Sequence, residues 1–66
     1  MVLKINGQPQ NMVNVATLQE LVYAKGLKAD SIVIEHNYAI IPRKEWGEIK
    51  LKDNDVIEVV SFVGGG

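Results

Sequence analysis

Few residues of this 66-residue chain could do chemistry, and they do not form a catalytic set. There is no cysteine, so disulfides and thiolate metal sites are excluded. His36 is the only side chain suited to act as a base near neutral pH, and we expect it to have a plain surface or edge role. Ser31, Ser61 and Thr17 supply hydroxyls, but Thr17 is expected to cap a helix. No nucleophile–base pair is therefore predicted.

The sequence ends in three glycines, Gly64, Gly65 and Gly66. At ordinary glycine content, only about 3 chains in 10,000 end in this way. A cloning remnant or a merely flexible tail would also account for it. A segment without Cβ atoms is thin enough for a narrow channel, and three extended residues reach about 10 Å. We therefore interpret the carboxylate of Gly66 as the best candidate for covalent chemistry, which predicts a substrate of enzymes and not an enzyme.

Two further stretches could contact a partner. In "IPRKEW", Trp46 could bury its ring to anchor a loop, or Arg43 or Trp46 could bind another protein. In the last strand, Val60 and Phe62 alternate away from the face expected to carry the helix, which suggests a docking patch on an open sheet face. The alternative is that Val60 and Phe62 only meet neighbours on the next strand.

One helix is expected to position these residues, over 17–25. Leu18, Leu21 and Val22 have helical spacing, and Thr17 with Glu20 forms a capping box. The helix is expected to end at Gly26 in a left-handed conformation, with Leu27 closing over Val22.

Alternating apolar residues and turn residues predict strands over 2–6, 10–15, 31–36, 37–41, 48–51 and 56–63. Asn6-Gly7 and Pro9 are expected to lie in the turn between the first two strands. The last stretch, "VIEVVSFV", reads as a central strand beside the first and parallel to it.

The predicted fold class is α+β: a β-grasp domain with a mixed sheet of four or five strands and one helix across one face. The domain is expected to span residues 1–63, followed by a flexible tail of residues 64–66. The expected core contains Leu3, Ile5, Leu18, Leu21, Val22, Ile32, Ile34, Ile57 and Val59.

Composition points away from nucleic acid and membranes. Seven basic and eight acidic side chains leave a formal net charge of −1, whereas nucleic-acid-binding domains usually show a basic excess. No apolar run reaches the length of a membrane span, and "MVLKING" lacks the layout of a signal peptide. We expect a soluble cytoplasmic protein that is a monomer when free.

Taken together, "IPRKEW", "DNDVIEVV" and "FVGGG" resemble the ThiS family, the ubiquitin-like sulfur carrier proteins that serve thiazole formation in thiamine biosynthesis. The resemblance covers the whole chain. One departure is Asn54, where many members have glycine between the two aspartates. Asparagine also tolerates left-handed backbone angles, so this departure puts little in doubt.

The resemblance implies that an E1-like activating enzyme adenylates the C-terminal carboxylate, here on Gly66, with ATP. A persulfide sulfur donor then converts it to a thiocarboxylate, and thiazole synthase takes the sulfur. Gly64 and Gly65 would be the part that these enzymes grip. ATP and Mg²⁺ belong to the activating enzyme, so the resemblance implies no cofactor on this chain.

Three other functions remain open at this point. The small subunit of molybdopterin synthase uses the same fold and tail, but such subunits tend to be longer and show no match to this P-R-x-x-W segment. A ubiquitin-like modifier would form isopeptide bonds with target lysines. An RNA-binding β-grasp appendage would fit poorly with the near-neutral charge.

Overall fold

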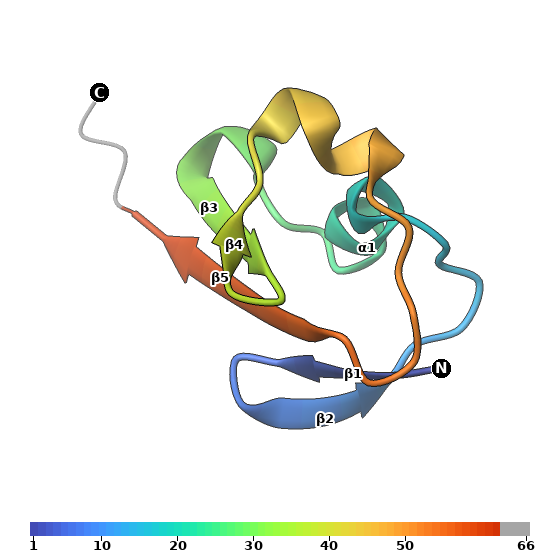
Figure 1. Cartoon of the computed structure of the whole chain (residues 1–66). Coiled ribbons are helices and arrows are strands. Elements are labelled where there is room, and N and C mark those ends of the chain that lie inside the picture. The colour runs from blue at the N-terminus through green and yellow to red at the C-terminus, as the bar shows by residue number, and fades with distance from the viewer. Residues whose placement is uncertain (63–66) are drawn as a thin grey trace.

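The computed structural model describes residues 1–62, which form one mixed sheet with a helix on one face (Figure 1). The sheet has five strands in the order β2-β1-β5-β3-β4. The strands are β1 (Val2–Ile5), β2 (Gln8–Asn11), β3 (Ile32–His36), β4 (Ala39–Ile40) and β5 (Val56–Ser61). The helices are α1 (Leu18–Ala24) and two 3-10 helices, η1 (Ala29–Ser31) and η2 (Arg43–Glu48). Val63 and the predicted tail, residues 64–66, lie outside the described residues.

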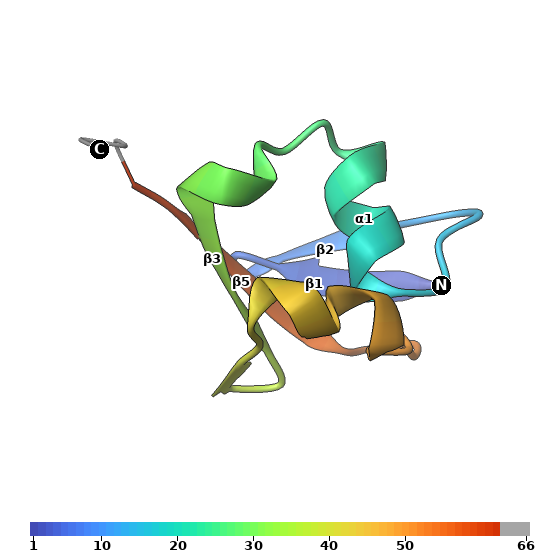
Figure 2. The same cartoon turned by 90° about the horizontal axis from the view of Figure 1, so that it is seen from above.

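Strand pairing confirms the predicted α+β fold. β5 is central, parallel to β1 and antiparallel to β3, with Ile5 opposite Ile57 and Ile34 opposite Val59. β1 pairs with β2, and β3 with β4, as antiparallel hairpins. α1 lies on one side of this sheet, as the view from above shows (Figure 2). No helix within residues 1–62 is long and apolar enough to cross a membrane.

The ends of α1 are those that the sequence predicts. Thr17 accepts a hydrogen bond from the Glu20 N–H at 3.2 Å, and the Glu20 carboxylate accepts one from the Thr17 N–H at 3.3 Å. At the other end Gly26 has a φ of 66°, and the Leu27 N–H donates to the Val22 carbonyl at 3.1 Å. These bonds satisfy the backbone groups that a helix leaves unpaired at its two ends.

The core lies between the sheet and the helices. Trp46 of η2 is 1% exposed, and its indole N–H donates to the Ile41 carbonyl at 3.0 Å. The anchoring role is therefore correct for Trp46, and a role in contacting a partner is wrong because the ring is enclosed. The full set of buried apolar residues is Leu3, Ile5, Val15, Leu18, Leu21, Val22, Ile32, Ile34, Trp46, Leu51 and Ile57.

Several details differ from the prediction; β4, for example, covers Ala39–Ile40 and not 37–41. β2 covers Gln8–Asn11, not 10–15, so Pro9 lies inside a strand; an edge strand tolerates proline because one of its sides needs no hydrogen bond. Residues 48–51 form no strand but only an isolated bridge between Lys50 and Thr17. Val59 is half-buried against the core and not fully inside it.

Candidate functional site at the end of the central strand

The central strand β5 is the last strand before the C-terminal glycines in the sequence. β1 and β3 flank β5 on its two sides. Beyond its last residue, the Phe62 N–H still donates to the Ser31 carbonyl at 3.0 Å. The C-terminal end of β5 lies on the opposite side of the molecule from the N-terminus (Figures 1 and 2). Gly64, Gly65 and Gly66 themselves lie outside the described residues.

Two asparagines in hairpin turns bind β5 from both sides. Asn6 and Asn37 each have a φ of 50°, in the left-handed region that asparagine tolerates. The Asn6 side-chain oxygen accepts from the Val59 N–H at 2.7 Å, and the Asn37 oxygen accepts from the Val56 N–H at 2.8 Å. These bonds satisfy β5 donors that the ladders leave free, so they help to fix the strand within the sheet.

A buried carboxylate connects the start of β5 to the turn between β3 and β4. Asp55 is 8% exposed, and its Oδ2 lies 2.8 Å from His36 Nε2 and accepts from the Lys52 N–H at 2.9 Å. Its Oδ1 accepts from the Asn37 amide at 3.1 Å. An ionised carboxylate can only accept, so the contact with His36 requires a proton on Nε2. His36 therefore has a structural role inside a polar network, more specific than the surface or edge role predicted for it.

The same network decides the charge state of Asp55. Burial alone would raise the pKa of the Asp55 carboxyl, because it disfavours the ionised form. The hydrogen bonds from His36, Lys52 and Asn37 outweigh burial and hold this pKa below its ordinary value of 3.8. Asp55 is thus ionised at neutral pH and stabilises the loop that leads into β5.

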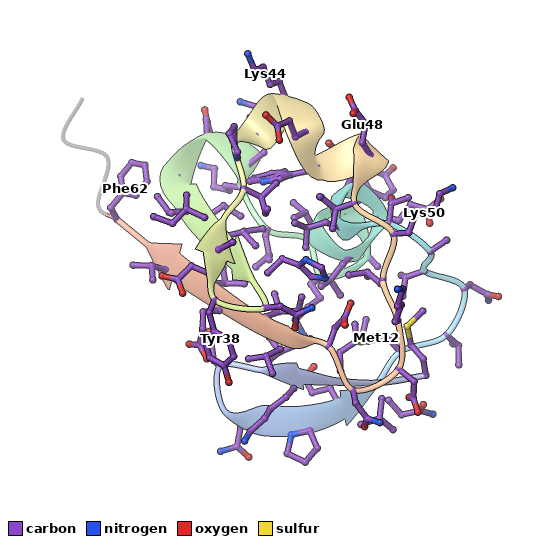
Figure 3. The ribbon with its side chains drawn as sticks, in the orientation of Figure 1. Met12, Tyr38, Lys44, Glu48, Lys50 and Phe62 are labelled. Atoms are coloured by element: carbon purple, nitrogen blue, oxygen red, sulfur yellow. The ribbon has the colours of Figure 1, made fainter. Side chains whose placement is uncertain are left out.

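The face of the sheet opposite α1 carries exposed apolar side chains near the end of β5. Val60 is 56% exposed and Phe62 is 47% exposed, while Ile57 on the other face is fully buried. Val60 does meet a cross-strand neighbour, Val33 of β3, but Val33 is itself exposed. We call this set the open-face patch: Val33, Val60 and Phe62. Figure 3 shows Phe62 at the end of β5 that leads toward the tail.

The described side chains form neither a metal-binding cluster nor an enclosed pocket. Within residues 1–62 no three histidine or acidic side chains gather to hold a metal ion. Nor does this part of the chain enclose a pocket.

The exposure of Val60 and Phe62 agrees with the sequence prediction, but sequence reasoning missed two features. One is the Asp55 network, because nothing local in the sequence brings Asp55 to His36, 19 residues away. The other is Val33. The alternation of "SIVIEH" already places Val33 on the other face of its strand from Ile32 and Ile34.

This domain is a β-grasp protein. It has the strand order of that fold, a central parallel pair formed by β1 and β5, and one α-helix across one face of the sheet. The sequence model of the ThiS family matches residues 3–66. The chain belongs to the ThiS family.

Individual relatives agree with this assignment. The sulfur carrier protein ThiS of Bacillus subtilis is 37% identical over 65 residues, which cover 97% of this chain and 98% of the relative. A thiazole synthase of Magnetococcus marinus is 36% identical over 66 residues; this chain is matched completely but spans only 20% of that relative's length. The crystal structure of the thiamine biosynthesis protein ThiS from Geobacter metallireducens superposes with a TM-score of 0.84 at 29% identity, covering all of both chains.

Proposed function

We propose that this protein is the sulfur carrier for thiazole formation in thiamine biosynthesis, and that Gly66 is the residue that carries the sulfur. The observation that supports this most strongly is the family match over residues 3–66, which includes the three glycines. The similarity to a sulfur carrier protein of nearly equal length supports it as well.

The proposed chemistry begins with activation of the Gly66 carboxylate, which is a poor electrophile. An E1-like enzyme transfers AMP from ATP to it and releases pyrophosphate, which gives an acyl-adenylate with a good leaving group. The terminal sulfur of a persulfide attacks the acyl carbon and expels AMP. This forms a C–S bond and gives an acyl disulfide that keeps the S–S bond of the donor. A thiol then attacks the donor sulfur of that S–S bond and forms a disulfide with it, which leaves a thiocarboxylate on Gly66. ATP and Mg²⁺ serve the activating enzyme, and this chain needs no cofactor of its own.

Thiazole synthase is the proposed acceptor of the sulfur. Two thiazole synthases contain a segment similar to the whole of this chain, which indicates that such a domain and a thiazole synthase act together in those organisms. Gly64 and Gly65 would lie in the channel of each partner enzyme, where a side chain would not fit.

The open-face patch is the proposed docking surface for these enzymes. Val60 and Phe62 lie four and two residues before Gly64 in the sequence, so contacts at the patch would set the distance over which Gly66 must reach. Apolar side chains exposed beside one another are common features of protein interfaces.

An activation assay tests the proposal. The activating enzyme is incubated with ATP and labelled pyrophosphate, and exchange of label into ATP is measured with and without this protein. We expect exchange to depend on the chain and to be nearly lost on deletion of Gly66, which draws the carboxylate back by about 3.5 Å. A misplacement near 1 Å can already cost about a hundredfold in rate.

A second variant tests the width of the glycine segment separately from its length. Gly65→Val keeps the chain length but adds a β-branched side chain, and we expect it to block exchange while the unfolding temperature stays that of the wild type. Exchange at the wild-type rate with the Gly66 deletion would contradict the proposal.

A further inference from the structure

Two glutamates face each other in the middle of the open sheet face. The register of β3 and β5 places Glu35 directly opposite Glu58, and Val33 directly opposite Val60 two residues further along. Because side chains of a strand alternate between faces, both pairs lie on the side away from α1. The acidic pair therefore adjoins the open-face patch.

Like charges directly opposite on paired strands destabilise a sheet. Both glutamates are half-buried, which weakens screening by water. Among residues 1–62 the one ion pair is His36–Asp55, so no cation of the described chain neutralises Glu35 or Glu58. Lys4 of β1 lies on the same face, beside Val56, and forms no ion pair with either glutamate.

Apolar side chains flank the acidic pair on two sides. Val33 and Val60 form the adjoining row, and Ile40 of β4 lies opposite Glu35 and is exposed. A partner that covered these apolar groups would also exclude water from the two carboxylates. Charged hydrogen bonds formed there would be stronger than on an open surface.

We propose that the partner docking on this face inserts an arginine or lysine side chain between Glu35 and Glu58. The inference rests on the proposed function and names thiazole synthase as the partner, since two thiazole synthases carry an equivalent of this chain within the same polypeptide. The inserted cation forms an attractive interaction with each glutamate. The two carboxylates that repel each other in the free domain therefore stabilise the complex.

Charge argues against other occupants of this face. A second copy of this chain, related by two-fold symmetry, would bring four carboxylates together. The phosphates of a nucleic acid or an anionic membrane would also be repelled. A protein surface with a cation surrounded by apolar side chains matches both properties of the face.

The double variant Glu35→Gln/Glu58→Gln tests the proposal, because it removes the charges and keeps the shape. Binding to purified thiazole synthase from the same organism is measured by calorimetry at about 50 mM and about 500 mM salt, a range over which the screening length falls severalfold. The matched control is Glu48→Gln, an exposed glutamate on η2 on the other side of the molecule from the open face (Figure 3).

We expect the double variant to bind about tenfold more weakly than the wild type at low salt, with a smaller difference at high salt. Its unfolding temperature should equal or exceed that of the wild type, because a repulsion is removed, and the control should bind like the wild type. Equal affinity of double variant and wild type at low salt would overturn this inference alone. Absence of binding by the wild type would overturn this inference and the choice of thiazole synthase as acceptor, while the exchange assay would still report on activation.

Discussion

At the scale of single residues, Asp55 connects three parts of the chain through one carboxylate: the β3–β4 turn, residue 52 and the start of β5. Its folded-state pKa is below 3.8, so the unfolded chain binds more protons in acid. The stability that Asp55 contributes is therefore present above about pH 4 and is lost as the pH falls through the folded pKa.

We predict that Asp55→Asn lowers the free energy of unfolding by about 1–3 kcal/mol at neutral pH, because the variant loses charged hydrogen bonds. The difference from the wild type should shrink as the pH falls from about 5 to about 2. Urea titrations over this range measure it. Asp30→Asn, at an exposed position of η1, is the control and should change the free energy of unfolding at neutral pH by less than about 0.5 kcal/mol. A constant difference at all pH values would mean that Asp55 does not carry the acid sensitivity.

Tyr38 is a second residue that affects stability, because its backbone conformation is strained. Both hairpin turns have two central residues with positive φ: Asn6 and Gly7 in the first, Asn37 and Tyr38 in the second. Glycine adopts such angles without penalty, whereas Tyr38, at a φ of 73°, is strained. Its ring is 79% exposed and so gains little from packing.

Tyr38→Gly should therefore raise the free energy of unfolding by about 0.5–1 kcal/mol, even though glycine adds freedom to the unfolded chain. Asn54→Gly, at the same φ of 73°, should gain less because asparagine tolerates left-handed angles better than tyrosine does. Thermal unfolding of both variants checks this. Destabilisation by Tyr38→Gly would show that the exposed ring contributes more than the strain costs.

At the scale of elements, α1 has the strongest local signals, and the predicted span of 17–25 matches the helix together with its two cap residues. Its apolar period, its capping box and its terminal glycine all favour the same helix, and tertiary packing favours that helix as well. β2 and residues 48–51 were misassigned because short alternating stretches do not specify which neighbour pairs with them. The bridge between Lys50 and Thr17 depends on where η2 ends, which no local pattern states.

Leu21 tests whether α1 contributes its apolar face to the core as described. It is 1% exposed, and Leu21→Ala should lower the free energy of unfolding by about 2–5 kcal/mol, since deletion leaves a cavity under the sheet. Tyr23→Ala, on the exposed side of the same helix, should change it by less than about 0.5 kcal/mol. Chemical denaturation gives both values. Similar effects of the two substitutions would show that the buried face is misassigned.

At the scale of the whole molecule, the candidate site combines features that are local in the sequence with features that depend on distant strands. The terminal glycines and the outward alternation of Val60 and Phe62 are local features, and both could be read directly. The acidic pair could not, because it depends on the register between β3 and β5, which lie far apart in the sequence. The Asp55 network was missed for the same reason.

Phe62 tests the docking surface. Because its ring is 47% exposed beyond the end of β5, Phe62→Ala should leave folding nearly unchanged. Binding to the activating enzyme or to thiazole synthase should weaken by more than about 1 kcal/mol if Phe62 is a hot spot of the interface. Tyr23→Ala removes an aromatic ring of α1 that is 87% exposed, on the other side of the sheet from the patch, and should bind normally. If Phe62→Ala bound both enzymes with unchanged affinity, the patch would only pack against neighbouring strands and would not be a docking surface.

The central claim is that the carboxylate of Gly66 receives the sulfur, and intact mass spectrometry tests it most directly. The protein is incubated with its activating enzyme, ATP, a persulfide donor and a thiol, and then weighed and fragmented. We predict a mass gain equal to the replacement of one oxygen by sulfur, found only in fragments that contain Gly66. Sulfur on any other residue, or the same gain in a chain that lacks Gly66, would contradict this account.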